Sequence, residues 1–198
     1  STVSLISNLC PGIFDLTITD SKGCTLDSSF IINNSDGPIP ALTGDTASCF
    51  NSCDATASSS TSGGTTPYTF LWDDPSSQTS SSATGLCKGT YELYVTDDIG
   101  CIGIGTTTIA EPSQLTNTVS TADADCNSSC NVTTTASVSG GTSPYTYLWS
   151  NLQTGNPATG LCSGTYFVTV SDANNCTRID SIMVDETSTL SLSINGAN

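Results

Sequence analysis

Cysteines recur at fixed intervals along this chain, and these intervals show that it consists of tandem repeats. The ten cysteines occupy four recurring positions, namely Cys10/Cys87/Cys162, Cys24/Cys101/Cys176, Cys49/Cys126 and Cys53/Cys130. Residues 63–72 (GGTTPYTFLW) also return as residues 140–149 (GGTSPYTYLW). Self-similarity at a fixed period, here about 75 residues, indicates a repeat architecture. A unit of this length suits a small self-contained domain.

The repeat positions divide the chain into four parts. We expect residues 1–38 to be the C-terminal half of a repeat, and residues 39–112 and 113–187 to be full repeats. Residues 188–198 are then the first strand of a following repeat. Because the sequence begins and ends within a repeat, we expect it to be a segment of a longer repetitive protein.

Charge and composition limit the partners of this chain. It has 3 Lys and Arg against 18 Asp and Glu, so its net charge is −15. Such a surface repels phosphates, and we expect no binding to nucleic acid or anionic membranes. No apolar run reaches the roughly 18 residues of a membrane helix, which predicts no membrane insertion. The chain contains no histidine and therefore no His-based catalytic group, so we do not expect an enzyme.

Alternating apolar residues predict strands rather than helices. Tyr91, Leu93 and Val95 share one face of a strand, as do their counterparts in the other repeats. Tyr68, Phe70 and Trp72 do the same further upstream, which places Trp72 in the core. About seven such short strands per repeat predict an all-β fold of tandem antiparallel sandwiches, Ig-like or PKD-like.

The cysteines are typical of disulfides in an extracellular, oxidising compartment. Small domains with limited cores use disulfides for stability, and here the cysteine spacing repeats. Zinc is the alternative, but the spacing of Cys49 and Cys53 has one residue too many for a zinc knuckle and histidine is missing. We therefore expect disulfides and no metal.

Strand direction predicts which cysteines pair within a repeat. Cys87 and Cys101 flank one strand, so they lie about 26 Å apart, too far for a disulfide. Cys53 and Cys87 both precede strands that start at the same end of the sandwich. We therefore pair Cys53 with Cys87, and by repetition Cys130 with Cys162. Each bond closes a loop of about 35 residues and stabilises the fold by about 4 kcal/mol.

The remaining cysteines predict bonds between repeats. Cys49 lies at the end where its repeat finishes, and Cys176 lies at the end where the next repeat starts, so we expect a Cys49–Cys176 disulfide. By the same reasoning Cys10, Cys24, Cys101 and Cys126 should pair outside this segment. The alternative is pairing within repeats, Cys49 with Cys101 and Cys126 with Cys176, which requires the opposite strand directions.

The order of these motifs resembles the SprB-type repeat. The succession Cys-x-x-x-Cys, Gly-Gly-Thr-x-Pro-Tyr-Thr-x-Leu-Trp, Gly-Leu-Cys-x-Gly-Thr-Tyr and Val-x-Asp-x-x-x-Cys runs through both full repeats. Similar repeats occur in large surface adhesins of gliding Bacteroidota. The resemblance implies type IX secretion, display on the bacterial cell surface, and a role in an adhesive or motility filament. Asp73-Asp74-Pro75 after Trp72, and Asn175 in place of glycine, depart from the pattern.

The same resemblance suggests glycosylation. Residues 45–47 and 180–182 match an Asp-Ser/Thr-aliphatic pattern that is similar to the O-glycosylation signal of Bacteroidota. Thr46 and Ser181 would then carry glycans, and the protein would be a glycoprotein.

Two classes of function remain. The first is a structural stalk or filament of a cell-surface adhesin serving adhesion or gliding motility. Its partners would be neighbouring repeats or chains and an unknown surface or glycan target. The alternative is a carbohydrate- or calcium-binding accessory module of a secreted enzyme. Trp72, Trp149 and Tyr94 would be the sugar platform. Asp97 with Asp98 would be the calcium site. We favour the stalk without cofactor, because neither cluster recurs on an outward face in each repeat.

Overall fold

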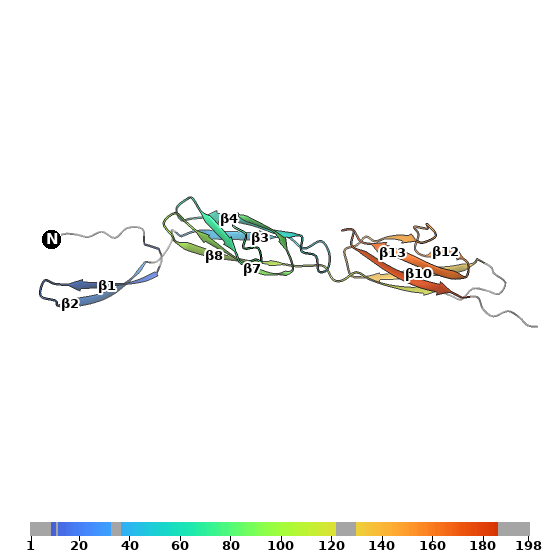
Figure 1. The fold of residues 1–198 in the computed structure, drawn as a ribbon, viewed down its shortest axis with the longest axis horizontal. Helices are drawn as coiled ribbons and strands as arrows, with labels where there is room; N and C mark the ends of the chain where they lie inside the picture. Colours follow the sequence, from blue (N-terminus) through green and yellow to red (C-terminus); the bar gives the residue numbers. More distant parts are fainter. Residues whose placement is uncertain (1–8, 11, 33–36, 122–129, 186–198) are drawn as a thin grey trace, which may run out of the picture. The chain divides into compact units, whose positions relative to one another are not determined.

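The structure is a computed structural model that describes residues 9–10, 12–32, 37–121 and 130–185. All regular elements in these ranges are β-strands, and no helix there is long and apolar enough to cross a membrane. The chain forms two compact units (Figure 1). Unit 1 comprises Ser1–Ala47 and Asn51–Ala110, and unit 2 comprises Ser48–Phe50 and Glu111–Asn198. The division after Ala110 lies two residues before the expected repeat boundary.

Unit 1 contains two three-stranded antiparallel sheets. The first has the order β3-β4-β6 and the second the order β5-β7-β8. Their bounds are β3 Ile39–Gly44, β4 Ala55–Ser62, β5 Thr69–Trp72, β6 Ser82–Leu86, β7 Gly89–Thr96 and β8 Ile102–Ile109. This is the strand order of an Ig-like sandwich with three strands in each sheet. The expected all-β Ig-like fold is therefore confirmed.

Unit 2 repeats the architecture of unit 1. Its sheets have the orders β9-β10-β12 and β11-β13-β14. The bounds are β9 Thr116–Thr121, β10 Val132–Ser139, β11 Thr146–Trp149, β12 Ala158–Leu161, β13 Gly164–Ser171 and β14 Thr177–Val184. Within the described residues, the repeat seen in the sequence is thus a repeat of six strands, not of about seven.

The cores of both units follow the period of two in their strands. Leu93 and Val95 on β7 are fully buried, and Trp72 on β5 pairs with Leu93. The facing sheet contributes small side chains such as Ala55 and Ala83. Small residues let the sheets pack around a large indole, so Trp72 dominates a compact core.

A parallel contact fixes the direction of the chain through unit 1. Thr46, just after β3, forms a parallel bridge with Ala110, just after β8, and the Ala47 N–H donates to the Ala110 carbonyl at 2.9 Å. Strands β3 and β8 therefore run the same way. The unit is entered at the end where β3 begins, called the near end, and left at the end where β8 finishes, called the far end. This is the polarity from which the cysteine pairing was predicted.

The N-terminal half-repeat forms a hairpin of β1 Gly12–Thr19 with β2 Thr25–Ile32. Phe14 and Phe30 stack with ring centroids 5.8 Å apart. Leu16 and Ile18, the counterparts of the buried Leu93 and Val95, are 40% and 55% exposed. The difference arises because β7 faces a second sheet of its own repeat, whereas β1 and β2 form a two-stranded sheet.

The core assignment predicts a large loss of stability on replacing one leucine of unit 1 and a small change on replacing another. Replacing the buried Leu93 by Ala should lower the free energy of unfolding of unit 1 by about 2–5 kcal/mol, because a cavity is left beside Trp72. Replacing Leu71, which is 48% exposed on β5, should change it by about 0.5 kcal/mol or less. Denaturant titrations followed by circular dichroism measure both. Equal effects would contradict the assigned inner and outer faces.

Candidate functional site: the disulfides and the loops around them

Strand register explains the disulfide at the far end of unit 1. Ala55 on β4 pairs with Leu86 on β6. Cys53 lies two residues before Ala55 and Cys87 one residue after Leu86, so both cysteines extend from one rung of the sheet. The structure joins them with a Cα–Cα distance of 3.9 Å.

Unit 2 repeats this arrangement. Val132 on β10 pairs with Leu161 on β12, and the flanking Cys130 and Cys162 form a disulfide with the same Cα–Cα distance of 3.9 Å. The two pairs are those that strand polarity predicts.

A third disulfide connects the two sequence repeats. Cys49 and Cys176 are bonded with a Cα–Cα distance of 5.8 Å. Residues Ser48–Phe50 belong to unit 2, although Ala47 and Asn51 on either side belong to unit 1. The chain therefore leaves unit 1 for three residues and returns to it. The bond is the inter-repeat pairing expected from the sequence, and not the alternative within repeats.

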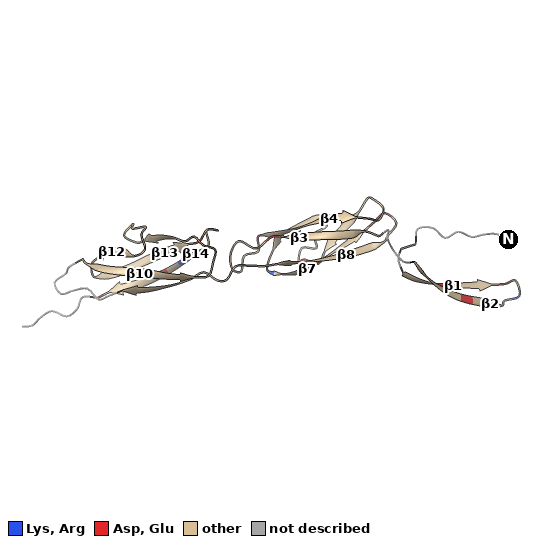
Figure 2. Cartoon of the chain, turned by 180° about the vertical axis from the view of Figure 1, so that it is seen from behind, with Lys and Arg blue, Asp and Glu red and all other residues tan. Residues whose placement is uncertain are grey.

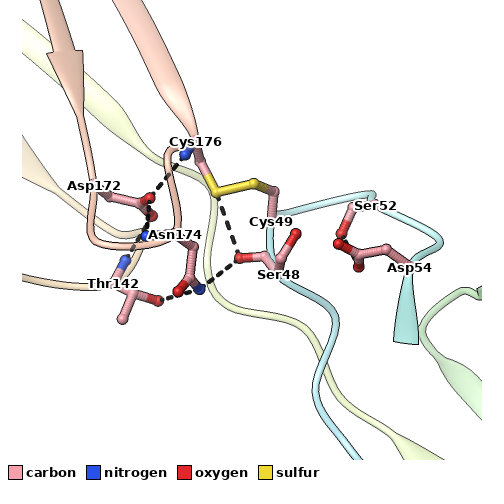
Figure 3. Close-up of a disulfide and its surroundings, with 8 residues drawn as sticks. All are labelled: Ser48, Cys49, Ser52, Asp54, Thr142, Asp172, Asn174 and Cys176. Carbon is pink, nitrogen blue, oxygen red and sulfur yellow. Dashed lines mark hydrogen bonds between the residues drawn. A yellow bond between two sulfur atoms is a disulfide. The ribbon is translucent and has the colours of Figure 1, made fainter. Parts of the chain in front are cut away.

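Asn174 holds the same three-residue segment by hydrogen bonds (Figure 3). Its Nδ2 donates to the Ser48 carbonyl at 2.8 Å and to Thr142 Oγ1 at 3.3 Å. The Cys176 Sγ lies 3.4 Å from the same Ser48 carbonyl, a close contact, since a disulfide sulfur carries no hydrogen. The counterparts of Asn174 are Lys22 and Ile99, so this residue is not a repeated motif, and sequence reasoning missed it.

A buried aspartate orders the turn that carries the inter-repeat cysteine. Asp97 Oδ1 accepts the Cys101 N–H at 2.8 Å and the Ile99 N–H at 3.2 Å, and Oδ2 accepts the Thr65 N–H at 3.0 Å. A Cβ on Gly64 would lie 2.9 Å from that Oδ2, and Gly64 has a φ of +66°. The glycines of the Gly-Gly-Thr motif therefore let the backbone approach this carboxylate.

The aspartate recurs in unit 2 and in the half-repeat. Asp172 accepts N–H groups of Asn174, Cys176 and Thr142, each at 2.9 Å. Asp20 accepts those of Lys22 and Cys24, and the Cys24 N–H, followed by that of Lys22, lowers its pKa. These oxygens accept N–H donors, which is a common role of aspartate in turns. In the part of the chain that the structure describes, no group of three or more His, Cys, Asp or Glu side chains could hold a metal ion.

In the loop after each tryptophan, a glutamine side chain pairs with the backbone. Gln78 donates to the Thr84 carbonyl at 3.0 Å and accepts the Thr84 N–H at 3.0 Å. Gln153 makes the same pair of bonds with Thr159. Gln78 lies six residues after its tryptophan and Gln153 only four, so this loop is where the repeat interval shortens. The changed spacing hid the equivalence of the glutamines in the sequence.

Asp74 adds a charged contact to the loop of unit 1. It is 4% exposed and accepts hydrogen bonds from the Ser76 N–H, the Gln78 N–H and the Gln78 side-chain amide. Burial raises the pKa of Asp74, but the donors from Gln78 and Ser76 outweigh burial and hold the pKa below its ordinary value. The Asp73-Asp74-Pro75 departure from the repeat pattern is therefore a local turn structure.

The two tryptophans considered as a sugar platform lie in the hydrophobic cores of their units. Trp72 and Trp149 are each 1% exposed, and their Nε1 atoms donate to the carbonyls of Ser80 at 3.0 Å and Gly155 at 2.9 Å. Tyr94 donates its hydroxyl to Glu92 at 2.7 Å, which raises the pKa of Tyr94. Both tryptophans are core residues.

Positive charges are sparse and dispersed (Figure 2). Lys22 lies in the β1–β2 turn, Lys88 between β6 and β7, and Arg178 on β14. Arg178 lines a cavity of about 240 Å³ beside the Cys49–Cys176 bond, and Asp172 contributes an opposite charge to the same lining.

Two of the four cysteines expected to pair outside the segment do not do so. Cys10 and Cys101 form a disulfide with a Cα–Cα distance of 5.2 Å. Cys10 lies just before β1, and the register Gly12↔Ile32 places the start of β1 beside the end of β2. β3 follows β2 in the sequence and begins at the near end of its repeat, which is also where Cys101 lies. Cys24 is an exposed free thiol, and Cys126 lies outside the described residues. Residues 188–198 also lie outside them.

Both residues proposed for glycosylation are exposed. Thr46 follows β3, and Ser181 lies on β14 opposite the exposed Phe167. Their accessibility is compatible with modification, which stays a prediction.

Comparison with known families matches the sequence motifs. The family model of the SprB repeat matches residues 47–77 and 118–154. Two stretches of the chain therefore match the SprB repeat. Both matches run through the recurring aromatic strand, β5 or β11, so the family pattern covers corresponding regions of the two units. No curated protein matches the chain.

Solved structures similar to these SprB repeats are tandem Ig domains. DIP-gamma IG1+IG2 is 11% identical with a TM-score of 0.38, covering 77% of this chain and 99% of that one. The N-terminal four Ig domains of Dscam1 isoform 6.44 are 12% identical with a TM-score of 0.30, covering 84% of this chain and 52% of that one. The chain thus spans about half of the Dscam1 structure. The Ig-like assignment rests on strand order, since likeness this low carries no argument.

Disulfide mapping tests the covalent connections directly. Chymotryptic digestion of denatured, non-reduced protein should separate Cys49 from Cys53 by cleavage after Phe50. Mass spectrometry should then find Cys53–Cys87, Cys130–Cys162 and Cys49–Cys176 in different peptides. A Cys49–Cys101 peptide would show that the strand polarity is wrong, and free thiols throughout would contradict an oxidising compartment.

The lowered pKa of Asp74 predicts a pH-dependent contribution to stability. Its folded pKa lies below the unfolded value, so the carboxylate stabilises unit 1 above about pH 4, and this is lost as the pH falls through the folded pKa. Asp74→Asn should lower the unfolding free energy by about 2 kcal/mol at pH 7 and by much less at pH 2. Thermal unfolding across this range measures the difference. The exposed Asp98→Asn is the control, and an equal penalty for Asp74→Asn at both pH values would contradict the charge effect.

Proposed function

We propose that this chain is a stalk segment of a large repetitive adhesin on a bacterial cell surface. The observation that carries the proposal is the succession of two SprB repeats, each an Ig-like unit, with a disulfide between the two repeat sequences. SprB-type repeats occur in exported surface proteins. Disulfides such as those found here persist in oxidising surroundings, which fits a location outside the cell. Repeated cores with varied surface positions are typical of a spacer.

The described parts of the repeats support a structural role over a catalytic or ligand-binding one. The tryptophans that recur in each full repeat are buried, and the recurring carboxylates accept backbone N–H groups. A sugar- or calcium-binding module of a secreted enzyme would use such groups for its ligand. The two repeated features therefore hold the fold and the cysteine-bearing turns.

The finer parts of the proposal concern export and purpose. We assign the protein to type IX secretion and to adhesion or gliding motility, through a surface or glycan target bound elsewhere in the polymer. Its immediate partners are neighbouring repeats or chains. Thr46 and Ser181 are the proposed glycan acceptors, and their exposure permits attachment.

Surface display and polymer length test this function. Antibodies raised against residues 39–187 should label intact cells of the source organism, and brief protease treatment of those cells should remove the label. The antibodies should also detect a polypeptide several times longer than 198 residues, and deletion of its gene should reduce attachment or gliding. A cytoplasmic protein, or a short secreted polypeptide that carries an enzyme domain, would overturn the proposal. The matched control is an antibody against a cytoplasmic protein.

A further inference from the structure

The spacing of cysteines within each repeat is more regular than the repeat length. The interval from Cys49 to Cys53 recurs unchanged from Cys126 to Cys130. A second interval occurs three times without change, as Cys10 to Cys24, Cys87 to Cys101 and Cys162 to Cys176. The loop after the tryptophan differs in length between the repeats, but these segments keep their lengths. The function proposed above does not explain this.

The disulfides connect these two short segments into one covalent route. From Cys101 the route follows the backbone to Cys87, and the disulfide carries it to Cys53. A short stretch of backbone leads to Cys49, and the next disulfide carries it to Cys176 in the second repeat. The route then begins again, because Cys176 leads through β13 to Cys162 and across to Cys130.

We propose that this route is a covalent spine that carries tension along the array. The described segments on it are Cys87 to Cys101 and Cys49 to Cys53 in the first full repeat, and Cys162 to Cys176 in the second. The other residues of each repeat lie in loops that are closed by the disulfides. Tension applied to the two ends of the chain does not act on these loops unless a covalent bond breaks.

The strand on the spine is suited to this load. β7 occupies eight residues of the segment from Cys87 to Cys101, and a β-strand already rises about 3.3 Å per residue against a limit of about 3.6 Å. β7 and β13 are also the central strands of their sheets, hydrogen-bonded on both sides. The buried Leu93 and Val95 anchor β7, and Val168 and Val170 anchor β13. The spine therefore has little slack to release.

The consequence is that an unfolded repeat lengthens the chain far less than a repeat without disulfides would. A repeat of about 75 residues without disulfides extends to about 270 Å at about 3.6 Å per residue. With the disulfides in place, only about 18 residues of each repeat lie on the spine. The extended length of the repeat is then limited to about 65 Å plus the length of two disulfides. If the hydrophobic core is lost under force, the end-to-end length of the chain would therefore increase only slightly. The residues in the closed loops would then refold from a confined state.

This inference rests on disulfide connectivity and not on the adhesive function, so the two fail independently. A secreted enzyme appendage with the same bonds would have the same spine. An adhesin with different bonds would lack it.

Force spectroscopy of the full chain, held by its two termini, tests the spine. In oxidised protein the shortest covalent route runs through residues 1–10, 101–87, 53–49 and 176–198, because Cys10 bonds Cys101. This route contains about 50 residues, so full extension should be about 190 Å at about 3.6 Å per residue. After reduction all 198 residues should extend to about 700 Å. Oxidised protein that reaches the reduced length would overturn the proposal.

Two chemically similar disulfides give matched variants. Removing Cys53–Cys87 by C53S/C87S forces the route along the backbone from Cys10 to Cys49, so full extension should increase by about 75 Å. Removing Cys130–Cys162 by C130S/C162S should leave it unchanged, because between these termini that bond lies off the route. Cys24→Ser, at the free thiol, should also have no effect.

The comparison does not depend on folding, since the limiting length is set by covalent bonds alone. Peptide mapping of each variant shows that its remaining disulfides have formed. Equal lengths for C53S/C87S and C130S/C162S would show that Cys53–Cys87 is not on a load-bearing route. The expected difference between them, about 75 Å in full extension, would establish the spine.

Discussion

Each full repeat depends on a disulfide that joins two neighbouring strands of its first sheet, just before the central strand of the second sheet begins. The cores are small, and in unit 1 one sheet contributes mainly alanines, so burial alone provides limited stabilisation. The Cys53–Cys87 bond removes conformational freedom from the unfolded chain at the rung where β4 begins and β6 ends. It also leads directly into β7, whose buried leucine and valine belong to the same core as the tryptophan. The sheet pairing, the core and the disulfide therefore meet at one end of the unit.

The opposite end is organised by hydrogen bonds to a carboxylate. Asp97 and Asp172 draw together the hairpin turn and the Gly-Gly-Thr loop, and the turn presents the cysteine four residues later. A turn fixed by three donors positions that cysteine before it bonds, so less chain entropy is lost when the bond forms. The same motif therefore has two consequences, a closed end of the sandwich and a correctly placed inter-repeat thiol.

Two residues that differ between the repeats and still make specific hydrogen bonds lie in loops outside the strands that form the cores. Asn174 holds the Ser48 carbonyl in unit 2, and its counterpart in unit 1 is Ile99. Asp74 of unit 1 is replaced in unit 2 by the uncharged Asn151, whose Oδ1 accepts the Gln153 N–H at 3.2 Å. Such residues adapt a loop to its own length or contact, while the buried aspartate, tryptophan and cysteines stay the same. A spacer with a uniform frame and individual loops fits the structural role proposed for these SprB repeats.

The sequence by itself determined most of the strands, the inward tryptophans and the Cys53–Cys87 and Cys130–Cys162 pairs, and it left two partners for Cys49, of which the structure shows Cys176. It did so because alternation, repetition and strand polarity are properties of local segments. Only the tertiary structure decided that each full repeat has six described strands, and that Gln78 and Gln153 pair with backbone in the loop after the tryptophan. It also decided that Cys10 reaches Cys101 and that Asn174 holds Ser48. These contacts join loops distant in sequence, and neither alternation nor spacing specifies which loops meet at one end of a sandwich.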